Sequence, residues 1–175
     1  IDNAKAAYDV VHYLIGLGHK KIAMMNGKET ATVSQRRRRG YLQAMEEAGL
    51  ETDDMWIENG EFDEEGAYKA TFRLLDNCPG MTAIFCSSDL MAVGVIRALN
   101  EKGLQVPDDV SVVGFDDIPA AKYINGGLTT VAQSPYMTGR IGGELLFRMI
   151  KDKKTYGHVY VDYNFIKRAT VKACP

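Results

Sequence analysis

The spacing of apolar positions along the chain predicts helices that alternate with short strands. Apolar residues recur at helical spacing from Ala4 to Ile15, and Gly18 is suited to end that helix. Similar spacing predicts helices at residues 34–48, with Ser34 as the N-cap, 64–75, 89–102 and 137–150. Short apolar runs predict strands at residues 21–25, 56–57, 83–86, 110–113 and 128–132, and extended segments at 159–161 and 165–166. This alternation is typical of βαβ units, so we expect an α/β fold with a parallel sheet between two helical layers.

One predicted helix has almost no polar face. Between Asp89 and Lys102, only Arg97, Asn100 and Glu101 are polar, and the first two turns are apolar all round. One side can pack on the sheet, but the other needs cover. Burial within a larger protein would provide it, and so would a second subunit. We favour the subunit interface, since exposed apolar patches are typical of interaction sites.

The composition is that of an ordinary globular domain. The 175 residues are 46 % hydrophobic and 25 % charged, with a net charge of −2, and one domain of this length can bury a sizeable core. The acidic balance argues against an electrostatic footprint for nucleic acid. The four arginines at 36–39 do not change this, because neighbouring helical residues point about 100° apart. We expect three of them to be solvated and one to face a cleft.

Cysteine usage favours a reducing, cytoplasmic compartment. Cys78, Cys86 and Cys174 form no C-x-x-C pair, and an odd number is a poor disulfide framework. No apolar run approaches the length of a membrane span, and no signal peptide is visible. The chain does not begin with Met and opens in a helix, so we expect a fragment or a processed chain, located in the cytoplasm.

Polar side chains follow three of the predicted strands. These residues are Asn26, Gly27, Ser34 and Arg37 after the first strand, Ser87, Ser88 and Asp89 after the third, and Asp116 and Asp117 after the fourth. Because the carboxyl ends of parallel strands share one edge of a sheet, the three groups should converge. Together they suit a small polar or polyhydroxylated ligand.

Each of these residues also has a purely structural interpretation. Asp89 is a good N-cap for the helix that it begins, and Ser88 is a capping type too. Asp117 would suit the turn at residues 118–121. Phe62, after a short strand, could stack on a ligand ring or pack in the core. We expect Asp116 to be the ligand carboxylate and Asp117 to serve the turn.

No recognisable catalytic or metal-binding pattern is present. The three histidines are scattered, and H-E-x-x-H, Cys/His metal spacing, a Walker loop, G-x-G-x-x-G and G-x-S-x-G are all missing from the sequence. No nucleophile is paired with a general base. We therefore expect no enzyme activity, no metal and no cofactor.

Several segments together resemble the lactose-repressor (LacI/GalR) family of bacterial transcription regulators. They are LIGLGHKKIAMMNG, the S-x-x-R-x-x-G-Y pattern at 34–41, TAIFCSSDLMAVG, GLQVPDDVSVVGFDD, GGLTTVAQ and FIKRAT. They run in the family's order over nearly the whole chain. Two positions depart from the pattern, since Ser88 stands where the family usually has Asn and Ala169 where it usually has Ser.

The resemblance implies the C-terminal lobe of an effector-binding domain like the type I periplasmic binding proteins. Residues 1–127 and 155–175 would form this lobe. Residues 128–154 would be a strand and a helix of an N-terminal lobe that is mostly outside the chain. We accordingly expect the strand at 128–132 to have lost its sheet, and the chain alone to bind effector weakly.

The resemblance also assigns roles to individual residues. It implies effector contacts at Arg37, Phe62, Ser88, Asp116 and Gln133. It implies a dimer interface on the helix that starts at Asp89, with these candidates: Leu90, Val93, Arg97 and Tyr123.

The function implied is effector sensing and dimerisation in a DNA-binding transcriptional regulator. A small molecule, a sugar or a related polar metabolite, would bind between two lobes and shift their relative orientation. Operator DNA would be bound only through a helix-turn-helix outside this chain, and no membrane would be involved. The alternatives are a periplasmic or lipoprotein sugar-binding receptor of an ABC transporter, which has a similar fold, and an α/β enzyme.

Overall fold

The computed structural model describes residues 1–152 and 157–174. The α-helices are α1 (Asn3–Gly16), α2 (Thr32–Glu47), α3 (Glu64–Asn77), α4 (Asp89–Glu101) and α5 (Pro135–Lys151). The strands are β1 (Ile22–Asn26), β2 (Ile57–Asn59), β3 (Ala83–Cys86), β4 (Ser111–Asp116), β5 (Thr129–Ala132) and β6 (Asn164–Ile166). Short 3₁₀ turns are at Asp54–Trp56, Pro119–Lys122 and Ile124–Gly126.

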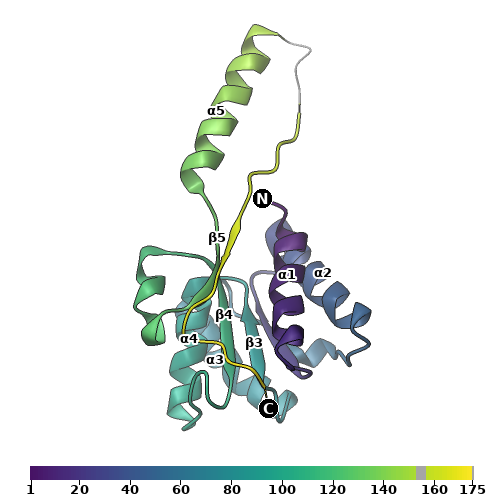
Figure 1. Ribbon diagram of the computed structural model, residues 1–175, viewed down its shortest axis with the longest axis vertical. Coiled ribbons are helices and arrows are strands. Elements are labelled where there is room, and N and C mark those ends of the chain that lie inside the picture. Colours follow the sequence, from purple (N-terminus) through teal and green to yellow (C-terminus); the bar gives the residue numbers. More distant parts are fainter. Residues whose placement is uncertain (153–156, 175) are drawn as a thin grey trace.

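The strands form one sheet in the order β2-β1-β3-β4-β5-β6. All neighbours are parallel except β6, which runs antiparallel to β5. Helices α1 and α2 lie on one side of the sheet and α3 and α4 on the other (Figure 1). The predicted α/β fold with helices on both faces of a mostly parallel sheet is confirmed.

Alternate strand residues supply two separate cores. Met25, Cys86 and Val112 pack with α3 and α4 on one face, whereas Met24 and Phe85 pack with α1 and α2 on the other. Because both faces are covered, β1, β3 and most of β4 are fully buried. This explains why their sequences read as continuous apolar runs without alternation.

The helix ends match the sequence in part. Gly18 and Gly49 follow α1 and α2 with φ of 92° and 65°, the left-handed region that favours glycine. The predicted N-cap Ser34 is wrong, because α2 begins at Thr32 and its N-cap is Ala31. Ser34 instead lies in the first turn of α2 and is buried.

Strand β5 has not lost its sheet, so that expectation is wrong. Its residues pair with β4 from Val113↔Thr129 to Asp116↔Ala132, and β6 covers its other edge. Thr129 and Thr130 are fully buried. The returning segment of the chain supplies the second neighbour, which the sequence order alone does not reveal.

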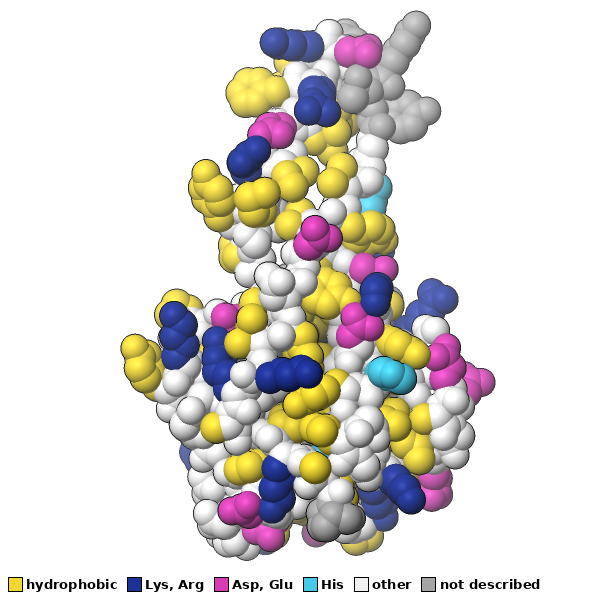
Figure 2. All heavy atoms as spheres, in the orientation of Figure 1, with side chains coloured by type: hydrophobic (Ala, Val, Ile, Leu, Met, Phe, Trp, Pro, Cys, Tyr) yellow, Lys and Arg dark blue, Asp and Glu magenta, His cyan; other side chains and the backbone are white. Residues whose placement is uncertain are grey.

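Helix α5 extends away from the body of the molecule (Figure 1). None of its residues is buried, and hydrophobic side chains gather over this projecting part (Figure 2). The exposed large hydrophobic residues of α5 are Tyr136, Leu146, Phe147, Met149 and Ile150. The predicted lobe boundary between residues 154 and 155 lies outside the described residues.

Candidate functional site

The candidate site lies at the edge of the sheet where the parallel strands end. The loop after β1, the start of α4 after β3, the turn after β4 and the segment between β5 and α5 all reach this edge. The predicted convergence of polar groups is therefore present in the fold.

Arg37 is held rigidly beneath this edge. It is 5 % exposed, and its guanidinium stacks on Phe115 with Cζ 3.6 Å from the ring centroid. Nε donates to Asn3 Oδ1 at 2.9 Å, and Nη1 donates to the carbonyl oxygen of Ser87. Burial lowers the pKa of Arg37 to about 10, while Asp116 nearby acts against that shift. The side chain therefore stays cationic at neutral pH in a fixed orientation.

Asp116 is the last residue of β4 and is partly buried. Its Oδ1 accepts a hydrogen bond from Gln133 Nε2 at 2.6 Å. Burial raises the pKa of Asp116 to about 6, although Arg37 and Gln133 both favour the ionised form. Three of the predicted effector residues, Arg37, Asp116 and Gln133, thus interact with one another through charge or hydrogen bonding.

The other two predicted effector residues are placed differently. Ser88 is the N-cap of α4, and its hydroxyl accepts from the Met91 backbone N–H at 3.2 Å. Its hydroxyl therefore already has a structural task. Phe62 is partly buried with φ of 62°, and its ring packs directly over Gly27, where any Cβ would overlap it. Phe62 therefore packs on the loop after β1, away from the residues that line the pocket with Asp116.

Two further residues at the site were missed by sequence reasoning. Asn3 orients Arg37 from the start of α1, and Arg168 forms an ion pair with Asp117 at 2.7 Å. Both contacts join segments more than thirty residues apart, so no local sequence pattern predicts them. The prediction that Asp117 serves its turn is consistent with this ion pair, since it fixes the turn to the returning segment.

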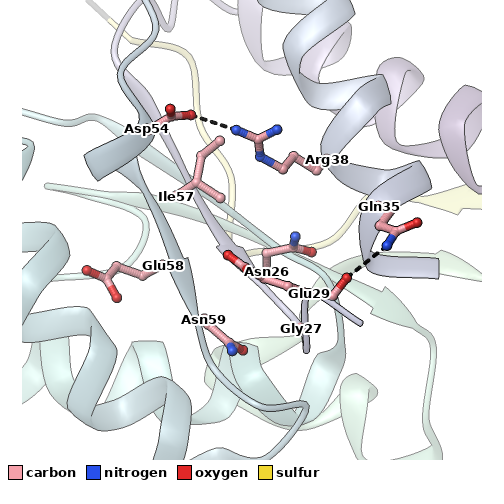
Figure 3. Close-up of a pocket in the computed structure, with 9 residues that line it drawn as sticks. All are labelled: Asn26, Gly27, Glu29, Gln35, Arg38, Asp54, Ile57, Glu58 and Asn59. Carbon is pink, nitrogen blue, oxygen red and sulfur yellow. Dashed lines mark hydrogen bonds and ion pairs between the residues drawn. The ribbon is translucent and has the colours of Figure 1, made fainter. Parts of the chain in front are cut away.

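The structure has two open pockets at this edge. One, of about 750 Å³, lies between the turn after β4 and the start of α5, and is lined by Asp116, Asp117, Ile118, Pro119, Gln133, Pro135, Thr138 and Gly139. The other, of about 440 Å³, lies beside the edge strand β2. Figure 3 shows that its polar side chains are partly paired with one another, Arg38 with Asp54 and Gln35 with the Glu29 backbone. The first pocket is lined by Asp116, the carboxylate whose pKa is raised by burial, and is the better candidate for ligand binding.

The proposed interface residues differ in how far they are exposed. Most apolar residues of α4 are buried within the chain, against α3 and the sheet. Leu90 is 50 % exposed and Tyr123 is 82 % exposed, while Val93 is partly buried. Arg97 is exposed and pairs with Glu64 and Glu65 of α3 at 2.6 and 2.7 Å. The helix is therefore less bare than its sequence suggests, and its uncovered apolar residues are Leu90 and Val93.

The described residues contain no cluster of three or more potential metal ligands of the His, Cys, Asp or Glu type. Within the same residues, no helix is both long enough and apolar enough to cross a membrane.

Comparison with known proteins identifies the family. Residues 11–171 match the model of the periplasmic binding protein-like domain. The HTH-type transcriptional repressor CytR of Escherichia coli (strain K12) is 38 % identical over 176 residues, which cover 100 % of this chain and 52 % of the relative.

Solved structures agree with this assignment. A complex of the transcriptional regulator CelR with cellobiose has a TM-score of 0.92 at 32 % identity, covering 97 % of this chain and 52 % of that one. A LacI family transcriptional regulator from Enterococcus faecium with bound ribose has a TM-score of 0.90 at 27 % identity, covering 99 % and 65 %.

The matches extend over almost all of this chain, which spans about half the length of the curated relatives it matches. These relatives are transcriptional repressors, which favours the regulator over the transport receptor with a similar fold. The chain belongs to the periplasmic binding protein-like domain family and is an effector-binding domain of the LacI/GalR type.

Proposed function

We propose that this chain senses a small polar effector within a bacterial transcriptional regulator. The observation that carries the proposal is the group formed by Arg37, Asp116 and Gln133 at the carboxyl edge of the sheet. A fixed guanidinium and a nearby carboxylate, both shielded from water, match a ligand that has both donor and acceptor oxygens.

The ligand class that fits these groups best is a sugar or a related polyhydroxylated metabolite. Within the described residues, Arg37 uses only Nε and Nη1 in hydrogen bonds, so further N–H groups are available to ligand oxygens. The carboxylate of Asp116 can accept from a ligand hydroxyl. Cellobiose and ribose in two structural relatives are of this chemical class.

Effector binding would act by shifting a conformational equilibrium. Gln133 lies between β5 and α5, so it belongs to the connection between the body and the projecting helix. A ligand that contacts both Asp116 and Gln133 favours the orientation of α5 in which both contacts are made. No bond is made or broken in such a cycle, and the protein is not an enzyme.

The division into lobes is part of the proposal. The expected division assigned residues 1–127 and 155–175 to one lobe and residues 128–154 to another. We keep α5 in the second lobe, because none of its residues is buried, but move β5 to the first, because it pairs with β4 and β6. The apolar side chains along α5 are typical of a helix that packs in a second lobe.

The remaining partners follow from this role. A homodimer would form through Leu90, Val93, Arg97 and Tyr123, and operator DNA would be bound by a helix-turn-helix outside residues 1–175. A regulator of this kind works in the cytoplasm, where it reaches DNA.

A ligand screen tests the proposed function. The full-length protein would be mixed with monosaccharides, disaccharides including cellobiose, nucleosides and nucleobases, and its melting temperature measured. A true effector raises the melting temperature in a concentration-dependent way. At one hundred times its Kd, it adds about 2.7 kcal/mol to the free energy of unfolding.

An Asp116→Ala variant is the control for that screen. Stabilisation of the wild type that is lost in this variant supports the proposal. A compound that stabilises both proteins equally binds elsewhere and counts against this site.

A further inference from the structure

Asp89 is a fully buried carboxylate that the proposed ligand contacts do not use. It was expected to be an N-cap, and this is wrong, because Ser88 caps α4 and Asp89 is the first residue of the helix. Its side chain reaches other elements instead. Oδ1 accepts from the Thr130 hydroxyl at 2.6 Å, and Oδ2 accepts from the Ile118 backbone N–H at 2.8 Å.

The surrounding chain leaves space for this carboxylate. Gly114 in β4 lies so close to it that a Cβ at that position would overlap Asp89 Oδ1. Burial raises the pKa of Asp89, whereas hydrogen bonds from Thr130 and from the backbone of Ile118 and Phe115 lower it. A buried carboxylate with several donors is costly to place unless each donor is well aligned. A buried carboxylate with several hydrogen-bond donors therefore indicates a role in holding the neighbouring chain segments in place.

The turn beside Asp89 is strained. Asp116 has φ of 119° and Asp117 has φ of 51°, backbone conformations that residues other than glycine adopt only rarely. Strain of this kind persists only where the surroundings impose it. Ile118, immediately after the strained pair, donates its backbone N–H to Asp89, and the backbone of Phe115, immediately before the pair, lies close enough to lower the pKa of Asp89.

We propose that Asp89 is a positioning residue of the effector site: its carboxylate holds the Asp116–Asp117 turn in the strained conformation that presents Asp116 to the ligand. This inference rests on the proposed function of Asp116. Since Thr130 belongs to β5, the same carboxylate also ties the turn to the strand that leads to α5, and through its own backbone to α4. Asp89 thereby connects the Asp116–Asp117 turn, strand β5 and helix α4.

The test needs no ligand, because the backbone conformation of the turn can be observed directly. In the isotope-labelled 175-residue chain, HN–Hα coupling constants and ¹³Cα and ¹³Cβ shifts report the positive φ of Asp116 and Asp117. We expect Asp89→Ala to lose this positive-φ signature at both residues. Asp89→Asn should retain it, because the amide oxygen can still accept from Ile118 and the amide nitrogen can face the Thr130 hydroxyl.

A role in core stability alone gives a different result. Val95→Ala removes buried volume from the same helix and should lower the melting temperature while leaving the signature intact. If Asp89→Ala folds and also keeps the positive-φ signature, the proposal is wrong.

A second variant covers the case in which Asp89→Ala does not fold. Thr130→Val keeps the shape of the side chain but removes one donor to Asp89. It should shift the amide resonances of Asp116, Asp117 and Ile118, and unchanged resonances there would overturn the inference. Failure of the proposed function is recognised separately. In that case Asp89→Ala loses the positive-φ signature, but the ligand screen gives no hit that depends on Asp116.

Discussion

At the scale of single residues, the proposed recognition site consists of a buried guanidinium and a partly buried carboxylate whose positions are fixed by other groups. Arg37 is fixed by Phe115, Asn3 and Ser87, and Asp116 by the strained end of β4. Neither side chain therefore has to lose much conformational freedom when a ligand binds. This preorganisation reduces the entropy cost of binding.

Changing Arg37 to Lys tests the guanidinium. The positive charge remains, but the planar arrangement of donors and the stacking on Phe115 are lost. Hydrogen bonds to charged groups contribute about 1.5–3 kcal/mol each, so we expect effector affinity, measured by calorimetry, to fall about tenfold to a hundredfold. The matched control is Arg36→Lys, since Arg36 is exposed on the same helix and should bind like the wild type. Equal affinities for the Arg37 variant and the wild type would remove Arg37 from the site.

The pKa of Asp116 predicts a pH dependence of binding. Burial raises this pKa to about 6, so the acid is mostly ionised at pH 7 and mostly protonated at pH 5. A ligand hydroxyl that donates to the carboxylate binds the ionised form, and affinity should therefore be present above pH 6 and weaken as the pH falls through 6. The limiting slope is about tenfold per pH unit.

Calorimetry from pH 5 to pH 8 checks this dependence. Asp116→Asn supplies the control, because other groups such as His19 remain and any residual pH dependence must come from them. Affinity that is constant across this range in the wild type would contradict the assignment of Asp116 as an acceptor.

At the scale of elements, close contacts between helices define the two outer layers. A Cβ at Gly40 in α2 would overlap the Ala4 carbonyl oxygen of α1, and a Cβ at Gly94 in α4 would overlap the Glu64 carbonyl oxygen of α3. Helix α4 therefore lies so close to α3 that most of its apolar surface is covered within the chain. Only a small apolar surface around Leu90 and Val93 is left for a partner.

Substitution of Val93 by Asp tests whether α4 lies in a dimer interface. A carboxylate at this position would be buried without a partner across the interface, which costs several kcal/mol. We expect sedimentation of the full-length protein to show a dimer for the wild type and a monomer for Val93→Asp. Asn100→Asp, an exposed position farther along α4, should remain dimeric. A dimer in both variants would place the interface on another surface.

The sequence predicted the type of every long element, because strong periodicity and glycine caps are local properties. Strand β3 was predicted with its exact ends, and α1, α3 and α4 within about two residues. Errors arose where a tertiary contact decides the role. Asp is a residue type that is favoured at N-caps, but the carboxylate of Asp89 accepts hydrogen bonds from Thr130 and Ile118 instead. Strand β5 was expected to lack neighbours because the family resemblance assigned residues 128–154 to another lobe, whereas β4 and β6 pair with it.

The candidate site was predictable to a similar extent. Arg37, Asp116 and Gln133 were named through their position after strands or through family resemblance, and the structure brings them together. Asn3 and Arg168 were not identified, since their partners are distant in sequence. The positive φ values at Asp116 and Asp117 also have no signal in the residue types alone.

At the scale of the whole molecule, α5 projects from the body and is joined to it by the short segment that follows β5 (Figure 1). The body has its own double core and covered sheet, and the first turns of α5 line the pocket of about 750 Å³ together with the turn after β4. A ligand bound in that pocket, as we propose, would contact both parts at once. Binding can then be converted into a change in the orientation of α5 relative to the body.

The most direct test of this account is a crystal structure of the full-length protein with the compound that the screen identifies. The account predicts a ligand at the turn after β4, with its oxygens within hydrogen-bond distance of the Asp116 carboxylate, which lines the pocket before α5, and of the nearby Arg37 guanidinium. A ligand seated instead beside β2, in the pocket lined by Arg38 and Asp54 (Figure 3), would contradict it.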